Sequence, residues 1–445
     1  MMLYKWHNNI FIIGLLTVSL IGVWTNQFSF DLMAIGTMIA FVSQMALLIY
    51  FVRDENVKYA ETTLLVTVLT YSILLGIVFM SLSEYFEGDT FMLTKKDAML
   101  YYKGSIRAYD VGFLENAANI MKARDFDDWG AFLYDSFLMS IIPSKFFLNA
   151  SYMLTGAISS VLLFRIGRHY MPEAYAFVGA LAYGTSSYLI MFHCTFLKES
   201  LFVFLVICTM YHLNRGMHKE SSTAYLFAVL FLFLLFFFRP AVAAFIIMSF
   251  GMYIAIKQHG SALSIFFYLA AAIGLVISIK YMMDMADRYS TSYDEKTELS
   301  GNAKAYSGGF NVFVNLFGGF FGPFPTLFTK HETGPSTIQF YGAGLTYRLF
   351  MIFPFLGGLY FILKNKVLEL LPITVFILVE MLATGMIAAS LELRKVMPHI
   401  PFTYIVSFYG LSKWQESKVF QRIPDALVFV VAIGIILLWN VIKTK

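Results

Sequence analysis

Six charged or titratable side chains in this chain directly adjoin long apolar runs. They are Asp97, Lys198, Glu199, Arg239, Arg394 and His399. A charge at the edge of hydrocarbon is costly, so it usually has a function. Carboxylates can take a proton from a hydroxyl group, and cations can bind phosphate. The six therefore predict one polar site beside a membrane, with an acidic group facing cations that bind phosphate.

Arg239 is the strongest single candidate. It interrupts the apolar segment FLFLLFFFRPAVAAFIIM. A guanidinium group keeps its charge in proteins, so it must find an anion or water. Phosphate suits its forked donors, which predicts that Arg239 binds a phosphate group. The alternative is a structural pair with an interior carboxylate.

Lys198 and Glu199 follow a very short turn and immediately precede an apolar run, in FLKESLFVFLVICTMYHL. The pair is therefore expected at the lip of a helical bundle. There Lys198 would bind phosphate and Glu199 would act as a base. The alternative is a lysine that extends toward water and an ion pair that helps the helix begin.

Asp97 begins an amphipathic stretch, in KKDAMLYYKGS. A carboxylate near the membrane surface is well placed to act as a general base. The alternative is a helix N-cap, a position that aspartate favours. The cluster of Asp125, Asp127 and Asp128 is a weaker candidate, because a run of acids is usually a solvated loop.

A last group of candidates stands in LELRKVMPHIPFTYIVSFYG. Arg394, Lys395 and His399 would bind a phosphate or pyrophosphate at the outer surface, or they would only anchor the end of a span in the interface. The histidines show no paired metal spacing, and no nucleotide-binding motif occurs. The sequence therefore predicts no metal site and no soluble cofactor.

These residues need a membrane-spanning scaffold to bring them together. The 445 residues are 59% hydrophobic and only 13% charged, whereas a soluble domain carries about a quarter charged residues. A span needs about 20 apolar residues. The sequence predicts an all-α, polytopic helical bundle of 12 or 13 spans near 9–26, 30–52, 62–83, 149–167, 174–193, 196–214, 222–238, 240–257, 261–282, 346–364, 367–390, 397–412 and 425–442. Residues 222–257 would be two short helices or one broken helix, because Pro240 follows Arg239.

The short basic loops set the expected orientation. They all fall on one side of the membrane, which the positive-inside rule makes cytoplasmic, so the six opening residues face outward. The net charge of +4 reflects these loops and predicts no nucleic-acid partner. The expected domains are a three-span extension (1–83), an outer loop of two or three amphipathic helices (84–148), a membrane core (149–282), an outer loop with a re-entrant segment at 309–329 (283–345) and the last spans (346–445).

The order and sidedness of these motifs resemble the GT-C superfamily of polytopic glycosyltransferases, which includes aminoarabinose transferases and protein O-mannosyltransferases. The resemblance is carried by DAMLYY at Asp97, FLKESLFVF at Lys198 and Glu199, the FRP break at Arg239, and the spacing of Arg394, Pro398 and Pro401. It implies a polyprenyl-phosphate sugar donor and a lipid or glycan acceptor. It also implies a base at Asp97, or less favourably Glu199, and phosphate binding by Arg239 with Lys198 or Arg394. A bacterial inner membrane is the location that this resemblance implies.

Three other functions compete with sugar transfer. A surface polysaccharide polymerase shares this layout and also uses lipid-linked sugars. A transporter or flippase of a lipid-linked or anionic substrate would show repeated halves and charges in the middle of spans, and neither is evident in the sequence. A catalytically inert assembly partner is the third alternative, because Asp97 lacks the adjacent second acid that the resemblance leads one to expect.

Overall fold

The computed structural model describes residues 43–44, 46–48, 50–51, 59–91, 95–219, 221–257, 349, 351–387, 397–417 and 425–444. Within these ranges the chain is helical and contains no β-strand. The α-helices are α3 (Ala60–Glu87), α4 (Lys95–Val111), α5 (Phe113–Ala123), α6 (Trp129–Ile141), α7 (Lys145–Gly167), α8 (Glu173–Gly184), α9 (Ser187–Cys194), α10 (Lys198–Lys219), α11 (Ser222–Phe236), α12 (Pro240–Lys257), α16 (Ile352–Lys364), α17 (Leu371–Ile387), α18 (Ile400–Ser412) and α20 (Asp425–Thr444). Three short 3-10 helices, η2 (Phe126–Asp128), η5 (Leu368–Leu370) and η7 (Trp414–Glu416), complete the described part.

The helices confirm the prediction of an all-α membrane protein. Within the described ranges, α3, α7, α10 and α12 are long and apolar enough to cross a membrane, and α8 with α9 passes the same test as a bent pair. The predicted spans 9–26 and 261–282, most of 30–52 and the predicted outer loop 283–345 lie outside the described residues. Apolar side chains on α11, among them Leu226, Val229 and Phe233, are exposed on the protein surface, as expected for a helix that faces lipid.

Helix α7 forms the centre of the bundle. It packs against α3, α8 and α10, and Tyr152, Ala157 and Phe164 along its length are fully buried. Helices α7 and α10 pack side by side, and near the end of α10 the side-chain amide of Asn214 donates to the hydroxyl of Tyr170, just after α7. The two helices therefore run in the same direction, and the beginning of α10 lies near the beginning of α7. This arrangement brings Lys198 and Glu199 to the end of the bundle from which the outer helices extend.

The span formed by α8 and α9 bends by 47° at its break. The side-chain amide of Gln44 donates hydrogen bonds there to the carbonyl oxygen of Ala182 at 3.1 Å and to Oγ1 of Thr185 at 3.2 Å. A bend removes backbone hydrogen bonds that hydrocarbon cannot replace. Gln44 therefore supplies a polar partner where the helix is interrupted.

Residues 222–257 form two helices, which settles the question that the sequence left open. The first, α11, ends at Phe236, and α12 begins at Pro240. Proline suits the first position of a helix because its missing N–H would have no helical partner there. The turn between the two helices carries Arg239.

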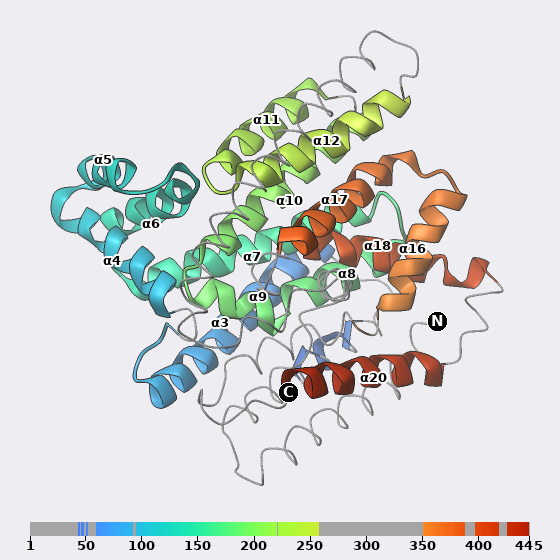
Figure 1. Cartoon of the computed structure of the whole chain (residues 1–445), viewed down its shortest axis with the longest axis horizontal. Helices are drawn as coiled ribbons and strands as arrows, with labels where there is room; N and C mark the ends of the chain where they lie inside the picture. The colour runs from blue at the N-terminus through green and yellow to red at the C-terminus, as the bar shows by residue number, and fades with distance from the viewer. Residues whose placement is uncertain are drawn as a thin grey trace.

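Three helices follow α3 in the predicted outer loop, in agreement with the predicted two or three. Figure 1 shows α4, α5 and α6 grouped at one end of the bundle. The buried amide of Asn116 in α5 donates to the carbonyl oxygen of Gly104 at 3.1 Å and to Oγ of Ser136 at 2.9 Å, which joins the three helices. Gly104 also lets α4 approach the ring of Phe132 on α6, since a β-carbon at Gly104 would lie 2.7 Å from that ring.

Candidate functional site

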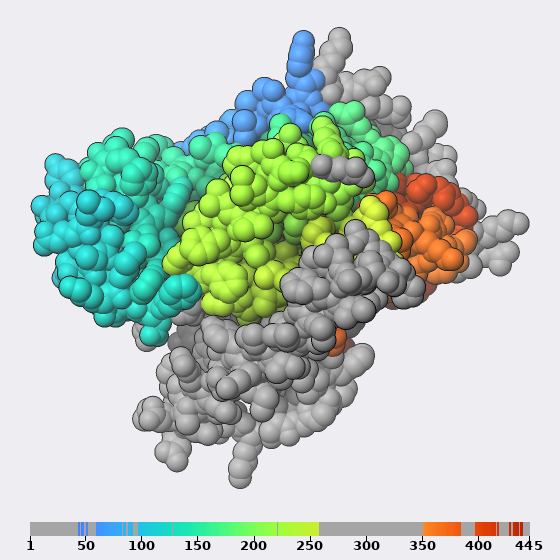
Figure 2. All heavy atoms as spheres, turned by 90° about the horizontal axis from the view of Figure 1, so that it is seen from above, coloured from blue at the N-terminus to red at the C-terminus, as the bar shows by residue number. Residues whose placement is uncertain are grey.

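The candidate site forms where four segments meet at this end of the bundle. They are α4, the η2 turn that leads into α6, the first turn of α10, and the turn between α11 and α12. The backbone N–H of Gly130 donates to the carbonyl oxygen of Phe237 at 3.0 Å, so the η2–α6 junction is joined to the α11–α12 turn. In Figure 2 the surface of α4–α6 adjoins the surface of α10–α12.

Arg239 pairs with Glu199 across this junction. Nη2 of Arg239 lies 3.5 Å from Oε1 of Glu199, and the guanidinium group lies over the ring of Phe202, 4.9 Å from its centre. The Glu199 side chain is 3% exposed and that of Arg239 is 28% exposed. Oε2 of Glu199 is buried and has no hydrogen-bond partner among the described residues.

A second ion pair lies beside the first. Nζ of Lys198 contacts Oδ1 of Asp128 in η2, and the two side chains are 15% and 35% exposed. The sequence interpretation placed Asp128 in a solvated loop, and its contact with Lys198 was missed. A pairing between residues 70 positions apart leaves no periodic signal in a sequence, so only the packing of η2 against α10 could reveal it.

Tyr101 lies among the acidic groups of the site. Its hydroxyl donates to Oδ1 of Asp128 at 3.4 Å. Burial, and then the nearby carboxylates of Asp128, Glu199 and Asp97, raise the pKa of Tyr101 well above its usual range. The phenol therefore stays protonated at physiological pH and acts as a hydrogen-bond donor to Asp128.

Asp97 is near this cluster but less buried than Glu199. It is the third residue of α4, in the first turn, rather than the N-cap residue that the alternative interpretation expected. Because Asp97 and Tyr101 are four residues apart on one helix, they share a face. The carboxylates of Asp97, Glu199 and Asp128 all act electrostatically on Tyr101, so the three acidic groups lie around this one phenol.

A further carboxylate at this end was missed in the sequence. Asp89 follows the end of α3, where Gly88 adopts φ +71°, and Oδ1 of Asp89 accepts the N–H of Phe91 at 2.8 Å. Lys145 at the start of α7 contacts the hydroxyl of Thr90, and its Nζ lies 3.6 Å from the centre of the Phe91 ring. The Gly-Asp pair directly after a span was the available signal.

The remaining predicted residues are not all placed in this cluster. His399 is fully buried and its Nδ1 contacts Oε2 of Glu380 on α17, so the structure gives it a carboxylate partner of its own. Arg394 and Lys395 lie outside the described residues. In the part of the chain that the structure describes, no group of three or more His, Cys, Asp or Glu side chains is arranged to hold a metal ion.

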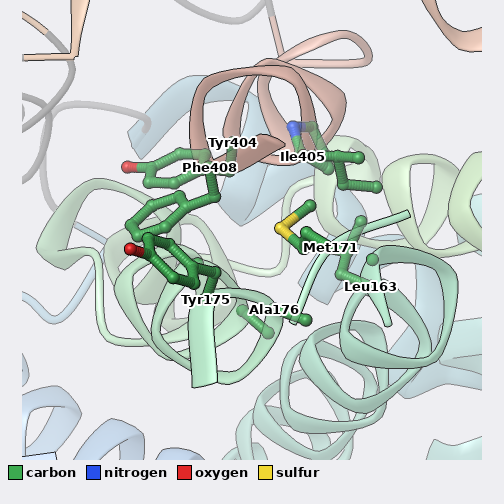
Figure 3. Close-up of a pocket in the computed structure, with 11 residues that line it drawn as sticks. Leu163, Met171, Tyr175, Ala176, Tyr404, Ile405 and Phe408 are labelled. Atoms are coloured by element: carbon green, nitrogen blue, oxygen red, sulfur yellow. The ribbon is translucent and has the colours of Figure 1, made fainter. Parts of the chain in front are cut away.

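An apolar pocket lies at the opposite end of α7 from Lys145. The residues that line it come from α7, from α8 and the residue Met171 before it, and from α18; they are Leu163, Gly167, Met171, Tyr175, Ala176, Gly179, Ala180, Pro401, Tyr404, Ile405 and Phe408. Figure 3 shows Met171 and Leu163 pointing toward this space, with Tyr175 and Phe408 beside each other. The pocket offers hydrocarbon contact and carries none of the charged residues that chemistry would need.

The comparisons with known proteins concern the same part of the chain as the ion pairs. The family model for dolichyl-phosphate-mannose-protein mannosyltransferases matches residues 136–282. This is about a third of the chain, and it contains Lys198, Glu199 and Arg239. No curated protein matches the sequence. The match confirms the resemblance to the GT-C superfamily and supports a membrane glycosyltransferase that uses a polyprenyl-phosphate-linked sugar.

Proposed function

We propose that this protein transfers a hexosyl or pentosyl group from a polyprenyl-phosphate donor to a lipid or glycan acceptor at the outer face of a bacterial inner membrane. The product would enter a cell-surface polysaccharide or glycolipid. The observation that carries the proposal is the Arg239–Glu199 pair, 3.5 Å apart and within the region that the family model matches. It joins a group that binds phosphate to a group that accepts a proton.

The basic residues at the opposite ends of the same helices support a site on the outer side of the membrane. Arg165 and Arg168 lie at the end of α7, and Lys219 ends α10. Basic residues at span ends favour the cytoplasmic side. The ends that carry Lys198, Glu199 and Arg239 are then the outer ones.

The proposed reaction is a displacement at the anomeric carbon. Arg239, with Lys198, would hold the phosphate of the donor and stabilise the charge that it gains as it leaves. The acceptor hydroxyl would give its proton to Glu199 or Asp97 as its oxygen forms the bond to the anomeric carbon. The bond from that carbon to the phosphate oxygen breaks, polyprenyl phosphate leaves, and the anomeric configuration inverts. The buried, half-unpaired Glu199 supports its choice as the base over Asp97.

Transfer assays on membranes that contain the variants would test this proposal. Labelled sugar on a polyprenyl phosphate is supplied, and its movement to the endogenous acceptor is measured at matched protein levels. Glu199→Gln is expected to lower transfer by at least about 100-fold, which is the lower end of the usual range for a general base. Asp97→Asn and Asp89→Asn are compared directly with it. Unchanged transfer in all three variants would overturn the assignment of a carboxylate base.

The role of Arg239 is tested separately. Arg239→Ala is expected to raise the donor concentration needed for half-maximal transfer by about tenfold or more, because a charged hydrogen bond is lost. Arg168→Ala, at the other end of the bundle, is the matched control. An unchanged donor dependence in Arg239→Ala would remove the phosphate role.

A further inference from the structure

The two partners of the Arg239–Glu199 pair have different needs in the proposed reaction. Arg239 must bind a phosphate, while Glu199 must accept a proton. In the structure the two side chains instead pair with each other, because Nη2 of Arg239 faces Oε1 of Glu199. The site as it stands therefore holds its phosphate-binding group and its base in a mutually neutralised form.

The geometry of the pair suits an exchange of partners. At 3.5 Å the contact is longer than a strong charged hydrogen bond, and the guanidinium is more exposed than the carboxylate it faces. The ring of Phe202 supports the guanidinium from one side. Arg239 can thus turn toward an anion that arrives from solvent or lipid without leaving this ring.

The carboxylate stays in place when the arginine moves. Glu199 is 3% exposed and belongs to the first turn of α10, and Tyr101 lies close to it. A carboxylate that loses its cationic partner accepts a proton more readily. The neighbouring Lys198 contacts Asp128 in the structure, so Arg239 is the cation that pairs with Glu199.

We propose that the donor phosphate and Glu199 compete for Arg239, so that binding of the donor frees Glu199 to act as the base. This inference rests on the proposed function and adds a link between the two halves of the site. Glu199 is then fully active as a base only when a donor is bound. Without a donor, Glu199 would be less able to take a proton from water or from the acceptor hydroxyl. The exchange itself forms and breaks no covalent bond.

Competition makes a prediction that a purely structural pair does not. Glu199→Gln removes the competing charge but keeps the shape of the side chain. It is therefore expected to bind a short-chain polyprenyl phosphate about five- to tenfold more tightly than the wild type, at the low end of usual coupling between sites, although transfer falls by at least about 100-fold. Binding is measured on the full-length protein in lipid nanodiscs.

A double-variant cycle identifies the arginine as the group that is competed for. In the Arg239→Ala background, Glu199→Gln is expected to change the affinity by less than about twofold, because the shared partner is absent. Glu61→Gln is the matched control. It removes the charge from the ion pair with Arg165 at the other end of the bundle and should leave the affinity for polyprenyl phosphate unchanged.

The outcomes separate this inference from the proposed function. Equal or weaker binding by Glu199→Gln would overturn the competition, as would tighter binding that persists without Arg239. Failure of the folded wild type to bind polyprenyl phosphate at all would instead overturn the proposed function. Thermal unfolding of each variant in detergent confirms that the compared proteins are folded.

Discussion

The two ends of helices α7 and α10 both carry charges, yet they are built differently. At one end, Glu61 on α3 pairs with Arg165 at 2.5 Å and with Arg168 at 3.1 Å, and all three side chains are about a third exposed or more. At the other end, Glu199 is almost completely buried and keeps one oxygen without a partner among the described residues. The carboxylate of the ion pairs at one end is about a third exposed, whereas the carboxylate of the Arg239–Glu199 pair at the other end is buried.

The difference comes from what covers each end. Helices α4–α6 and the α11–α12 turn surround the buried pair, whereas the Glu61 cluster remains accessible to water. Exposed ion pairs contribute about 0–1 kcal/mol, while breaking a buried pair by removing one partner costs several kcal/mol. Similar residue types thus form an accessible ion-pair cluster at one end of the bundle and a buried carboxylate at the other.

The largest expected difference is between Lys198→Ala and Arg168→Ala. The first leaves the half-buried Asp128 without its cation beside Glu199, and it removes one proposed phosphate ligand. Transfer should fall by about 100-fold, which corresponds to about 2.7 kcal/mol, and Arg168→Ala should stay within twofold of the wild type. Initial rates in membranes measure both. A similar loss in the two variants would remove the contrast between the ends.

A change in packing without a change in charge should have the next largest effect. A β-carbon at Gly130 would lie 2.2 Å from the ring of Phe238, next to Arg239. Gly130→Ala should therefore displace the α11–α12 turn and lower transfer roughly tenfold, since overpacking typically costs about 1–3 kcal/mol. Gly434→Ala is the control because, among the described residues, a β-carbon at Gly434 would meet no atom of a neighbouring segment within 4 Å. Wild-type kinetics in Gly130→Ala would show that the turn tolerates movement.

Asp135 tests whether burial alone makes a carboxylate functional. Its side chain is fully buried in α6 and accepts a hydrogen bond from the hydroxyl of Tyr152 at 2.7 Å. Asp135→Ala should destabilise the protein by about 1–3 kcal/mol, because the Tyr152 hydroxyl loses its acceptor, while Asp135→Asn should be tolerated. Thermal unfolding at matched detergent concentration distinguishes the two.

The same residue predicts a pH dependence. Burial raises the pKa of Asp135 well above its usual range, so the folded protein holds a proton that the unfolded chain releases near pH 4. The contribution of this group to stability is thus greatest below pH 4 and is lost as the pH rises toward the folded pKa. Asp135→Asn should lose less stability than the wild type between pH 5 and pH 8. Parallel unfolding curves would contradict this.

The smallest effect is expected at the exposed end. Glu61→Gln should lower stability by less than about 1 kcal/mol, and by less still at high salt, because water screens this pair. Thermal unfolding of Glu61→Gln at low and high salt measures this effect.

The sequence predicted the spans better than it predicted the contacts. Long apolar runs placed α3, α7, α10 and α12 correctly, because hydrocarbon demands length and composition that are visible in one dimension. Arg239 stood out for the same reason, as a fixed charge between apolar segments. The suggestion that it pairs with an interior carboxylate is also confirmed, and the partner is Glu199.

What could not be predicted depends on how distant segments pack. Tyr101 looks like one more aromatic residue of an amphipathic helix until α4 is placed against η2 and α10. Asp128 appears to be one of several loop acids until Lys198 reaches it. The assignment of His399 to the phosphate site stays a prediction, and its contact with Glu380 could not be read from residues 19 positions apart.

The hydrogen bonds from Gln44 show that the matched family region is not self-sufficient. Gln44 precedes residue 136, yet it satisfies a carbonyl group at the break between α8 and α9, inside that region. A backbone carbonyl left unpaired at membrane depth costs several kcal/mol. A chain shortened to residues 136–282 would keep Lys198, Glu199 and Arg239 but would lose the Gln44 amide that supports the bend between α8 and α9. The smallest part of the chain that folds must therefore be larger than the part that the family model matches.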